Sequence, residues 1–281
     1  MNGAAPAFEV IKAPESGPVV LSVPHAGRDY SPAHRALVRP PVERLLALED
    51  RLVDELVRNI PGAPVLIANA PRAWIDLNRH EAEIDPGLVD GAVASRLMLT
   101  AKVRSGLGLV PRRLAGVGEI WRGRLPLAAV EARLAELHRP YHAALRGLLQ
   151  ESLDAHGTAI LLDIHSMPPL SSGDAQLVIG NRFGQSAATW VSASVARTCT
   201  RLGLSWQENT PYPGGHIVER HGAPARGIHA VQLEFDRTLY LDDEQRECDP
   251  LKLERTRRIL SEIVADVKRA ALDEALPLAA E

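Results

Sequence analysis

An alternation of short apolar runs and longer helical segments constrains the fold of this chain more than any other feature of its sequence. The apolar runs are rich in Val, Ile and Leu, as buried strands should be. They cover residues 19–23, 64–70, 73–77, 159–164, 175–179 and 229–235. None of them approaches the roughly 20 residues that a helix needs to cross a bilayer.

The segments between these runs carry apolar residues at helical spacing. In the first, residues 42–60, apolar positions recur at that spacing from Leu45 to Ile60. The others are residues 125–155, interrupted near Pro140, then 185–202 and 251–272. Alternating strands and helices predict an α/β fold in which helices cover both faces of a central sheet. Because no repeat, low-complexity tract or Gly/Ser-rich linker divides the chain, we expect a single domain over residues 1–281.

The overall composition excludes several classes of protein. The formal net charge of −3 offers no electrostatic case for nucleic acid, which usually needs a basic face. Residues 1–16 contain Glu9 and Glu15 and lack the apolar core of a secretory signal. Cys199 and Cys248 are too few for a disulfide framework or a cysteine-based zinc site. These features predict a cytoplasmic protein that binds no membrane, while its ten histidines remain available as metal ligands.

The first strand end of chemical interest is Leu-Ser-Val-Pro-His-Ala-Gly at residues 21–27. A predicted buried strand runs directly into Pro24, which stops the hydrogen-bond ladder. Small residues flank His25 and allow other groups to approach it closely. His25 is therefore a candidate ligand at a strand end. A histidine that simply occupies a turn is the alternative, and this motif alone does not decide between the two.

Asp163 and His165 lie two residues apart in another predicted buried strand. Side chains alternate across a strand, so these two face the same way. A carboxylate beside a ligand histidine fixes the tautomer of the ring and raises its basicity. The alternative is a histidine that a nearby carboxylate merely satisfies. Because a charged aspartate in an apolar run is costly without a partner, the pattern favours a functional site.

The last predicted strand carries Gln232, Glu234 and Asp236 on one face, with apolar residues on the other. A carboxylate at the end of such a strand suits a general base. Glu234 is the candidate for this role. The alternatives are a solvated strand face or a salt bridge to Arg237.

Two further segments carry polar residues suited to a substrate. Asn78 and Arg79 follow the run 73–77, and a guanidinium offers a bidentate grip on a carboxylate. Exposed Asn–Arg pairs are common, so this signal is weak alone. Residues 209–216 contain two prolines and two glycines, which predict an irregular loop of a kind that is often functional.

Two groups of histidines resemble metal sites less convincingly. His138 and His142 are four residues apart on a predicted helix, but a proline lies between them and no carboxylate stands nearby on the same face. We expect them to be ordinary helical surface histidines. His216, Glu219 and His221 follow Gly-Gly in the predicted loop, so His216 is expected to be a pocket residue and not a ligand. The chain also lacks the zincin His-Glu-x-x-His motif, a Walker A loop and the Gly-x-Ser-x-Gly elbow.

Taken in order, the motifs of this chain closely resemble those of the N-formylglutamate amidohydrolase family. The resemblance spans roughly residues 18–270 and rests on Ser-Val-Pro-His-Ala-Gly, Glu49-Asp50-x-x-Val53-Asp54-Glu55-Leu56, Asp76-Leu77-Asn78-Arg79, Gly106-Leu107-Gly108-Leu109-Val110-Pro111, Pro140-Tyr141-His142, Asp163-Ile164-His165-Ser166-Met167, Pro-Tyr-x-Gly-Gly, Gln232-Leu233-Glu234 and Arg237-x-x-Tyr240. That family looks like a distant relative of the zinc carboxypeptidases and the succinylglutamate desuccinylases. The resemblance implies a mixed central sheet flanked by helices, of the phosphorylase/hydrolase-like type seen in zinc carboxypeptidases.

The resemblance also implies one zinc ion (Zn²⁺) per chain, held by two histidines and a carboxylate, although another divalent metal would suit the same ligands. His25 and His165 match the two histidines. Carboxypeptidases place a glutamate three residues after the first histidine, where this chain has an arginine. The carboxylate is therefore expected in the acidic segment that follows. Asp50 is the preferred ligand, with Glu49 and Asp54 as alternatives.

The same resemblance assigns roles around the metal. Glu234 is the general base, Asn78 and Arg79 grip one substrate carboxylate, Arg237 is a candidate for a second, and Arg72 is a candidate for stabilising the oxyanion. The implied reaction is zinc-dependent hydrolysis of N-formyl-L-glutamate to formate and glutamate, which closes a route of histidine degradation. The alternatives are another small N-acyl amino acid, such as N-succinylglutamate, and a binding protein that keeps the fold without catalysis. The sequence leaves the oligomeric state open.

Overall fold

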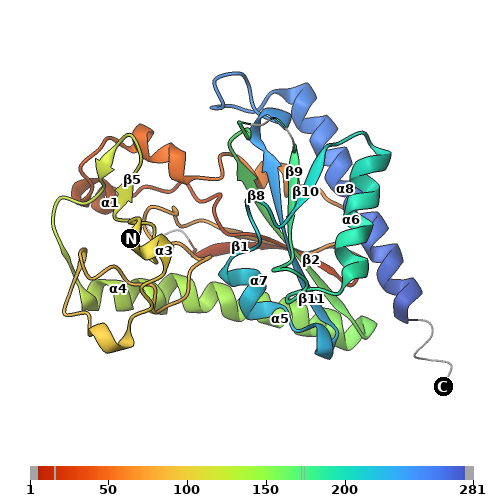
Figure 1. Cartoon of the computed structure of the whole chain (residues 1–281), viewed down its shortest axis with the longest axis horizontal. Helices are drawn as coiled ribbons and strands as arrows, with labels where there is room; N and C mark the ends of the chain where they lie inside the picture. The colour runs from red at the N-terminus through yellow and green to blue at the C-terminus, as the bar shows by residue number, and fades with distance from the viewer. Residues whose placement is uncertain (1–5, 16, 172, 174, 276–281) are drawn as a thin grey trace. The chain divides into compact units, whose positions relative to one another are not determined.

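The computed structural model of the chain describes residues 6–15, 17–171, 173 and 175–275 (Figure 1). The described chain divides into two compact units. The first unit contains Pro24–Asp50 and Ile67–Ala144, together with the described residues up to Glu9. The second contains Val10–Val23, Arg51–Leu66 and the chain from Leu145 onward. The single domain over residues 1–281 that the sequence suggests stays a prediction.

The main sheet has seven strands and is mixed. Its order is β1 (Phe8–Ile11), β3 (Val65–Ala68), β2 (Val19–Val23), β8 (Ala159–Met167), β11 (Ile228–Asp236), β9 (Leu177–Gly180) and β10 (Trp206–Glu208). Strands β2, β8 and β11 run parallel to one another, whereas β9 runs antiparallel to β11, and β10 is parallel to β9. The carboxyl ends of β2, β8 and β11 therefore point the same way.

Helices flank this sheet. In Figure 1, α6 (Thr189–Arg201) and α8 (Pro250–Ala275) lie to one side of the strands, and α7 (His216–His221) lies to the other. Helices α6 and α8 pack against each other, and α7 packs against β8 and β11. These contacts confirm the predicted mixed sheet flanked by helices. Among the described residues, no helix is both long enough and apolar enough to span a membrane.

Most of the predicted strands are confirmed, but the run 73–77 is not a strand. Its backbone turns instead, with the Trp74 N–H bonded to Pro71 O and the Asp76 N–H bonded to Leu109 O. Ile75 and Leu77 are nevertheless buried. The apolar pattern therefore reported burial correctly, while the buried Asp76 draws the chain into a turn by accepting a hydrogen bond from the Asn78 N–H.

The predicted helix over residues 42–60 is wrong in its middle. The segment forms a 3₁₀ helix η1 (Val42–Leu48) and a short helix α2 (Asp54–Val57) with an irregular turn between them. Leu52 adopts the left-handed region, with φ of 55°, which interrupts a right-handed helix. The turn also buries two carboxylates, Glu49 and Asp50, which a regular helix could not direct to their partners.

The helical prediction for residues 125–155 is confirmed in outline, but Pro140 does not break the helix. The chain runs from α4 (Leu127–Arg133) through one π-helical turn (Leu134–His138) into α5 (Arg139–His156). The wide turn closes on a bond from the Arg139 N–H to Leu134 O. A wider turn just before a proline relieves the clash of its ring with the preceding turn. The predictions for α6 and α8 are confirmed with bounds close to those expected.

The first unit also contains two short helices, α1 (Pro32–Leu37) and α3 (Ala101–Arg104), and two small two-stranded sheets. The small sheets are β4 (Val89–Asp90) with β7 (Leu125–Pro126), and β5 (Arg113–Leu114) with β6 (Gly118–Glu119). Much of this unit is therefore held by turns. The second unit contains the long strands β8 and β11.

Candidate active site

In the first unit, His25 lies in the turn that follows β2. This turn requires glycine at position 27, because a Cβ there would lie 2.2 Å from Ala70 O and would clash with it. Only glycine allows the backbone to approach so closely. A bridge between Gly27 and Pro71 then joins the His25 turn to the segment that begins the Arg72–Arg79 region.

The His25 ring is buried between two carboxylates. Its Nε2 lies 2.7 Å from Asp76 Oδ1, and its Nδ1 lies 3.4 Å from Asp50 Oδ2. The backbone holds the same arrangement, because the Asp50 N–H donates to His25 O at 3.1 Å. A carboxylate on one ring nitrogen fixes the tautomer and leaves the other nitrogen as a lone-pair donor. This is the arrangement of a histidine that is oriented to bind a metal.

Asp76 is the centre of this half of the site, and sequence reasoning gave it no role. Besides His25, its carboxylate accepts from Arg72 Nε at 2.9 Å and lies 3.6 Å from Arg79 Nε. Burial alone would raise the pKa of Asp76, but the charges of Arg72, His25 and Arg79 outweigh it and hold the pKa well below its usual value. A charged aspartate inside an apolar run was the signal that identified Asp163, and the same signal applied to Asp76.

Arg72, Asn78 and Arg79 therefore surround Asp76 rather than extending from a strand end. Arg72 also reaches towards Asp50, with Nη1 3.9 Å from Asp50 Oδ1. The side chains of Arg72 and Arg79 keep some exposure, 22% and 15%, whereas Asp76 is nearly fully buried. Each guanidinium is thus anchored on the buried aspartate while part of it remains accessible.

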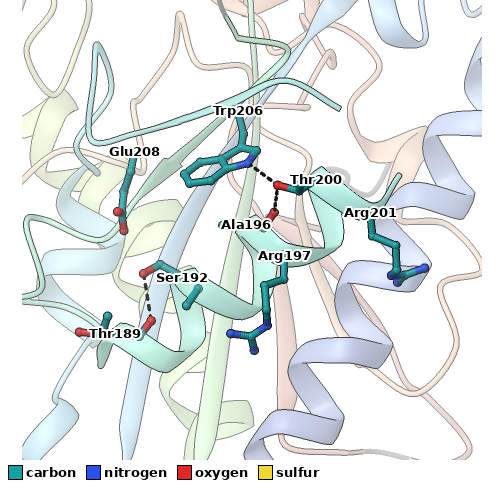
Figure 2. Close-up of a pocket in the computed structure, with 9 residues that line it drawn as sticks. Thr189, Ser192, Ala196, Arg197, Thr200, Arg201, Trp206 and Glu208 are labelled. Carbon is teal, nitrogen blue, oxygen red and sulfur yellow. Dashed lines mark hydrogen bonds between the residues drawn. The ribbon is translucent and has the colours of Figure 1, made fainter. Parts of the chain in front are cut away.

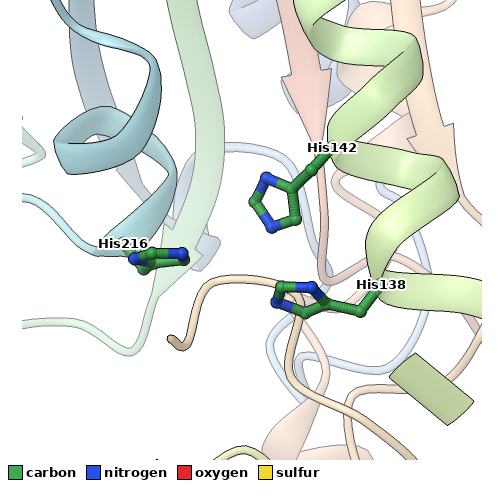
Figure 3. Close-up of side chains that lie close together, drawn as sticks. All are labelled: His138, His142 and His216. Carbon is green, nitrogen blue, oxygen red and sulfur yellow. The ribbon is translucent and has the colours of Figure 1, made fainter. Parts of the chain in front are cut away.

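His138 and His142 hold the Asn78–Arg79 segment from the other side. They extend from the same side of the helical segment that carries them (Figure 3). His138 Nε2 lies 2.9 Å from Arg79 O, and His142 Nε2 lies 3.0 Å from Leu77 O. Both rings are fully buried, so the expectation of surface histidines was wrong. The reason is that these rings donate to backbone carbonyls of an irregular segment, which has no ladder of its own.

The three carboxylates proposed as ligands have different surroundings. Asp50 faces His25, as described above. Glu49 is buried against Tyr30, where burial and the Glu49 carboxylate raise the pKa of the phenol. Asp54 belongs to the second unit and lies 3.5 Å from Arg58 Nη2. Of the three candidates, Asp50 is therefore the one that lies next to Nδ1 of His25.

In the second unit, His165 lies near the carboxyl end of β8. The strand places Asp163 on the same face, and His165 Nε2 lies 2.9 Å from Asp163 Oδ2. Asp163 also accepts a hydrogen bond from Ser22 Oγ at 2.7 Å, across from β2. All three side chains are buried. The pairing of Asp163 with His165 is as the alternation of the strand predicts, and an aspartate on Nε2 orients the ring so that its Nδ1 could bind a metal.

Glu234 lies on β11 directly beside His165. The two residues are register partners of the parallel pair β8–β11, so their side chains share one face of the sheet. Glu234 Oε1 accepts a hydrogen bond from Gln232 Nε2 at 2.7 Å. Gln232 had been noted only as a neighbour on the same face. The strand that sequence reasoning selected for a base therefore brings its carboxylate next to the second histidine.

Arg237 lies just past the end of β11, at the start of a 3₁₀ turn (Arg237–Leu239). Its side chain is buried, and its Nε donates to Ser166 Oγ at 3.2 Å. Asp236, the alternative partner, instead accepts bonds from the N–H and hydroxyl of Thr238. Ser166 is a second residue that sequence reasoning did not single out.

The Pro-Tyr-x-Gly-Gly segment forms the predicted irregular loop between β10 and α7. His216 begins α7 and is buried, with Nδ1 3.6 Å from Glu219 Oε2 (Figure 3). His216, Glu219 and His221 thus belong to a short helix and not to the loop, which corrects the expectation for them. The change has a local cause, because the glycines end at Gly215 and leave a helix-compatible sequence after it.

A separate groove of about 550 Å³ lies between α6 and the outer strand β10 (Figure 2). Trp206 forms part of its wall and donates from Nε1 to Thr200 Oγ1 at 3.0 Å. Arg197 and Glu208 supply its charges. None of the described residues that line it is a histidine, and none belongs to β8 or β11. The groove therefore does not coincide with the residues that carry the candidate chemistry.

Comparison with known proteins adds independent information on this chain. The family model for N-formylglutamate amidohydrolase matches residues 17–241. An N-formylglutamate deformylase of Pseudomonas putida is 32% identical over 242 residues, which cover 81% of this chain and 83% of the relative. A second N-formylglutamate deformylase, from Pseudomonas aeruginosa, is 31% identical over 265 residues, with coverage of 88% and 91%.

Solved structures are also similar. The crystal structure of an N-formylglutamate amidohydrolase from Ralstonia eutropha matches with a TM-score of 0.84 and 28% identity, over 96% of this chain and 98% of the other. A gene product of Agrobacterium tumefaciens matches with a TM-score of 0.67 and 18% identity, over 99% and 97% of the two chains. The second likeness concerns the fold alone.

Proposed function

The chain belongs to the N-formylglutamate amidohydrolase family, and we propose that it hydrolyses the formyl amide of N-formyl-L-glutamate to formate and L-glutamate. The observation that carries the proposal is the pairing of Glu234 with His165 on adjacent parallel strands. A buried carboxylate beside an oriented histidine supplies a proton acceptor next to a potential metal ligand. Relatives named for deformylation of N-formylglutamate support the choice of substrate.

We further propose that one zinc ion per chain supports the reaction, held by His25, Asp50 and His165. Each histidine bonds through Nε2 to an aspartate, so each would offer Nδ1 to a metal. Nδ1 of His25 also faces Asp50 Oδ2 at 3.4 Å, and two lone-pair donors at such a distance suit a shared cation. A set of two imidazoles and a carboxylate suits a catalytic zinc site, although other divalent metals accept it too.

The course of the chain supports the same ligand set. Ser22 of β2 and Asp163 of β8 are register partners on neighbouring parallel strands. His25 lies three residues after Ser22, and His165 lies two residues after Asp163. Neighbouring strands are about 4.8 Å apart, so the two histidines leave adjacent strands at nearly the same level. This register supports the proposal that the two histidines bind one ion.

A metal at this position would polarise the acyl carbonyl and acidify a water molecule towards neutral pH. Glu234 then acts as the base at its carboxylate, accepting a proton from the attacking water. The hydroxyl group adds to the formyl carbon, the C–N bond breaks, and Glu234 returns the proton to the leaving nitrogen. Arg72 is proposed to stabilise the negative charge on the carbonyl oxygen, because its guanidinium is fixed on Asp76 and partly exposed.

The two carboxylates of the substrate need cationic partners in a partly buried site. Asn78 and Arg79 are proposed to bind one of them, because Asp76 and His138 fix the segment that carries them. Arg237 is proposed to bind the other, since it is buried and oriented by Ser166. His216 is proposed to line the pocket at the start of α7. An acidic amino acid is therefore the class of leaving group that these residues suit.

We extend the proposal to metabolism and location as the family resemblance implies. The reaction would complete a route of histidine degradation in the cytoplasm. A related deacylase for N-succinylglutamate is the second candidate within hydrolysis. A binding protein without catalysis would have no use for a buried carboxylate beside an oriented histidine, so we favour an enzyme.

The test is a substrate panel on purified protein of known metal content. Formate or acid release is measured with N-formylglutamate, N-formyl-leucine, N-acetylglutamate and N-succinylglutamate, before and after removal of metal by a chelator. We expect the highest kcat/KM with N-formylglutamate, loss of turnover with the metal, and recovery on addition of zinc. Faster turnover of N-succinylglutamate would transfer the assignment to the second candidate. Absence of turnover on every substrate would refute the enzyme proposal.

A further inference from the structure

We infer that Gln232 is a positioning residue that couples the proposed base Glu234 to the loop before α7. The inference rests on the proposed function, because it takes Glu234 as the base. Gln232 lies two residues before Glu234 on β11, on the same face of the strand, and is 5% exposed. Nothing in the family resemblance or in the proposed chemistry gives it a role.

The side-chain amide of Gln232 is hydrogen-bonded at both its oxygen and its nitrogen. Its Nε2 donates to Glu234 Oε1 at 2.7 Å, and its Oε1 accepts from the Gly215 N–H at 2.8 Å. The Gly215 N–H can only donate, so the oxygen of the Gln232 amide must face it. The NH₂ group of the same amide then points towards Glu234. An NH₂ group needs an acceptor, which Glu234 Oε1 supplies. The loop therefore sets the orientation of the amide, and the amide in turn holds the carboxyl group of Glu234 in one position.

The loop that sets this orientation is itself tightly seated on the sheet. Gly180 of β9 is the register partner of Gln232 on β11. A Cβ at Gly180 would lie 2.7 Å from Gly214 N and 2.8 Å from Tyr212 O. The loop can therefore pack directly on β9 only because this position is glycine. Its backbone lies against the strands at the level of Gln232.

Arg182, two residues after Gly180, also holds the loop. The Arg182 N–H donates to Pro213 O at 2.7 Å, and Arg182 Nη2 lies 2.7 Å from Glu219 Oε1 on α7. Arg182 adopts a left-handed conformation, with φ of 53°, which a residue other than glycine takes only when its surroundings require it. The loop is thus fixed between this turn and β9, and Gln232 is its link to the proposed base.

This arrangement predicts more than a structural role. If Gln232 only satisfied the Gly215 N–H, its loss would affect stability and leave turnover per folded molecule nearly unchanged. If it positions Glu234, its loss lowers kcat, and it does so only while Glu234 is present. The two interpretations separate in a double-mutant cycle, because residues that act through one another give non-additive effects.

The experiment measures kcat and zinc content for wild type, Gln232→Met, Glu234→Gln and the double variant. Methionine keeps the length of the side chain but removes both hydrogen bonds. We expect Gln232→Met to retain zinc and to lower kcat on the order of 10–100-fold, as small misplacements of reacting groups do. In the Glu234→Gln background the same change should cost less than about 3-fold. Equal losses in the two backgrounds would overturn the inference.

Gln176→Met is the matched control. Gln176 precedes β9 in the same unit, and its side-chain oxygen accepts hydrogen bonds from Ser205, just before β10. This variant removes an amide of the same kind, so its kcat should stay within about 2-fold of wild type. A loss as large as that of Gln232→Met would show that removal of any glutamine near the sheet disturbs turnover, and it would overturn the specific role.

Amide hydrogen exchange provides a readout that does not depend on activity. Loss of the acceptor for the Gly215 N–H should speed exchange in the 211–217 segment on the order of 5–10-fold in Gln232→Met, and leave it unchanged in Gln176→Met. Unchanged exchange in this segment would overturn the link to the loop. If wild type released no formate, the proposed function would fail, while the exchange result would still decide whether Gln232 holds the loop.

Discussion

His25 in the first unit lies among turns and charged groups, whereas His165 in the second unit lies on a strand, with Asp163 on the same strand and Glu234 on the next. The aspartate that orients His25 also binds two arginines, Arg72 and Arg79. The aspartate that orients His165, Asp163, is held by the hydroxyl of Ser22 on the adjacent strand. Both units thus contain a carboxylate that contacts Nε2 of a histidine. In the first unit charged arginines hold this carboxylate in place, and in the second unit the register of neighbouring strands does so.

The difference has consequences for how each histidine responds to change. The Asp76 carboxylate compensates two guanidinium groups, so neutralising it would leave two cations without their shared partner. Asp163 instead bonds to Ser22 and His165, and its position is fixed by β2 and β8. We therefore expect the first unit to be the more sensitive to charge and the second to be the more sensitive to geometry.

The largest expected effect tests whether both histidines serve one metal. His25→Ala and His165→Ala should each reduce bound zinc from about one ion per chain to a small fraction, and turnover should fall to background, since catalytic zinc sites need three protein ligands. Metal content by mass spectrometry and formate release are the measurements. In addition, zinc should raise the melting temperature of wild type but not of either variant.

The comparison would break if only one of the two variants lost metal. A His25→Ala variant that kept stoichiometric zinc would place the ion on the second unit alone. Conversely, retention in His165→Ala would place it among the charges of the first unit. His34→Ala serves as a control, because the His34 ring stacks on Trp74 in the first unit and is not one of the proposed ligands.

The next largest effect separates binding from chemistry in the second unit. Glu234→Gln preserves the volume of the side chain but removes the base, so it should keep zinc and lose on the order of 10²–10⁴ in kcat. A rate assay at saturating substrate, together with metal content, provides the measurement. Near-normal turnover by the glutamine variant would remove Glu234 from the role of base, however well its register with His165 suits it.

A smaller effect addresses the two orienting aspartates directly. Asp76→Asn and Asp163→Asn should each weaken zinc binding about 10–100-fold, which is typical for loss of a partner that orients a ligand histidine. Only Asp76→Asn should also lower the melting temperature strongly in the metal-free protein, because it alone removes the carboxylate that Arg72 and Arg79 share. Equal losses of thermal stability would contradict the distinction between Asp76, which arginines hold in place, and Asp163, which strand register holds in place.

This contrast also explains what the sequence could predict. Strand periodicity predicts that Asp163 lies beside His165 and that Glu234 lies on a polar face. Side chains alternate between the two faces of a strand, so the face of each residue follows without knowledge of the partner strand. Periodicity says nothing about a turn, so Asp76 was missed although it follows the same rule of a charge within an apolar run. The run 73–77 was taken for a strand because burial and strand formation leave the same apolar pattern.

Other residues were beyond sequence reasoning for a different reason. Gln232 acquires meaning only when Gly215, which lies 17 positions away, bonds to its oxygen. The burial of His138 and His142 follows from carbonyls that are about 60 residues distant in the chain, namely 59 and 65. Long-range partners of this kind are set by the topology of the fold. The fold class itself was predictable because it depends on the alternation of element types and not on single contacts.

The last and smallest effect concerns substrate choice. Arg237 is buried in the second unit and donates to Ser166 Oγ, so it is already oriented before any substrate binds. If it pairs with the side-chain carboxylate of the substrate, Arg237→Met should lower kcat/KM for N-formylglutamate on the order of 10–100-fold more than for N-formyl-leucine, because only the former leaves a charge unpaired.

Arg201→Met provides a matched control, since Arg201 pairs with Glu262 and Asp266 between α6 and α8. It should alter neither substrate by more than about 2-fold. Equal losses on the two substrates in Arg237→Met would identify a structural arginine that holds the end of β11 to β8. The preference for acidic substrates would then depend on Arg79 and the other charged residues of the first unit alone. The two units would in that case differ in substrate binding as well as in how their histidines are oriented.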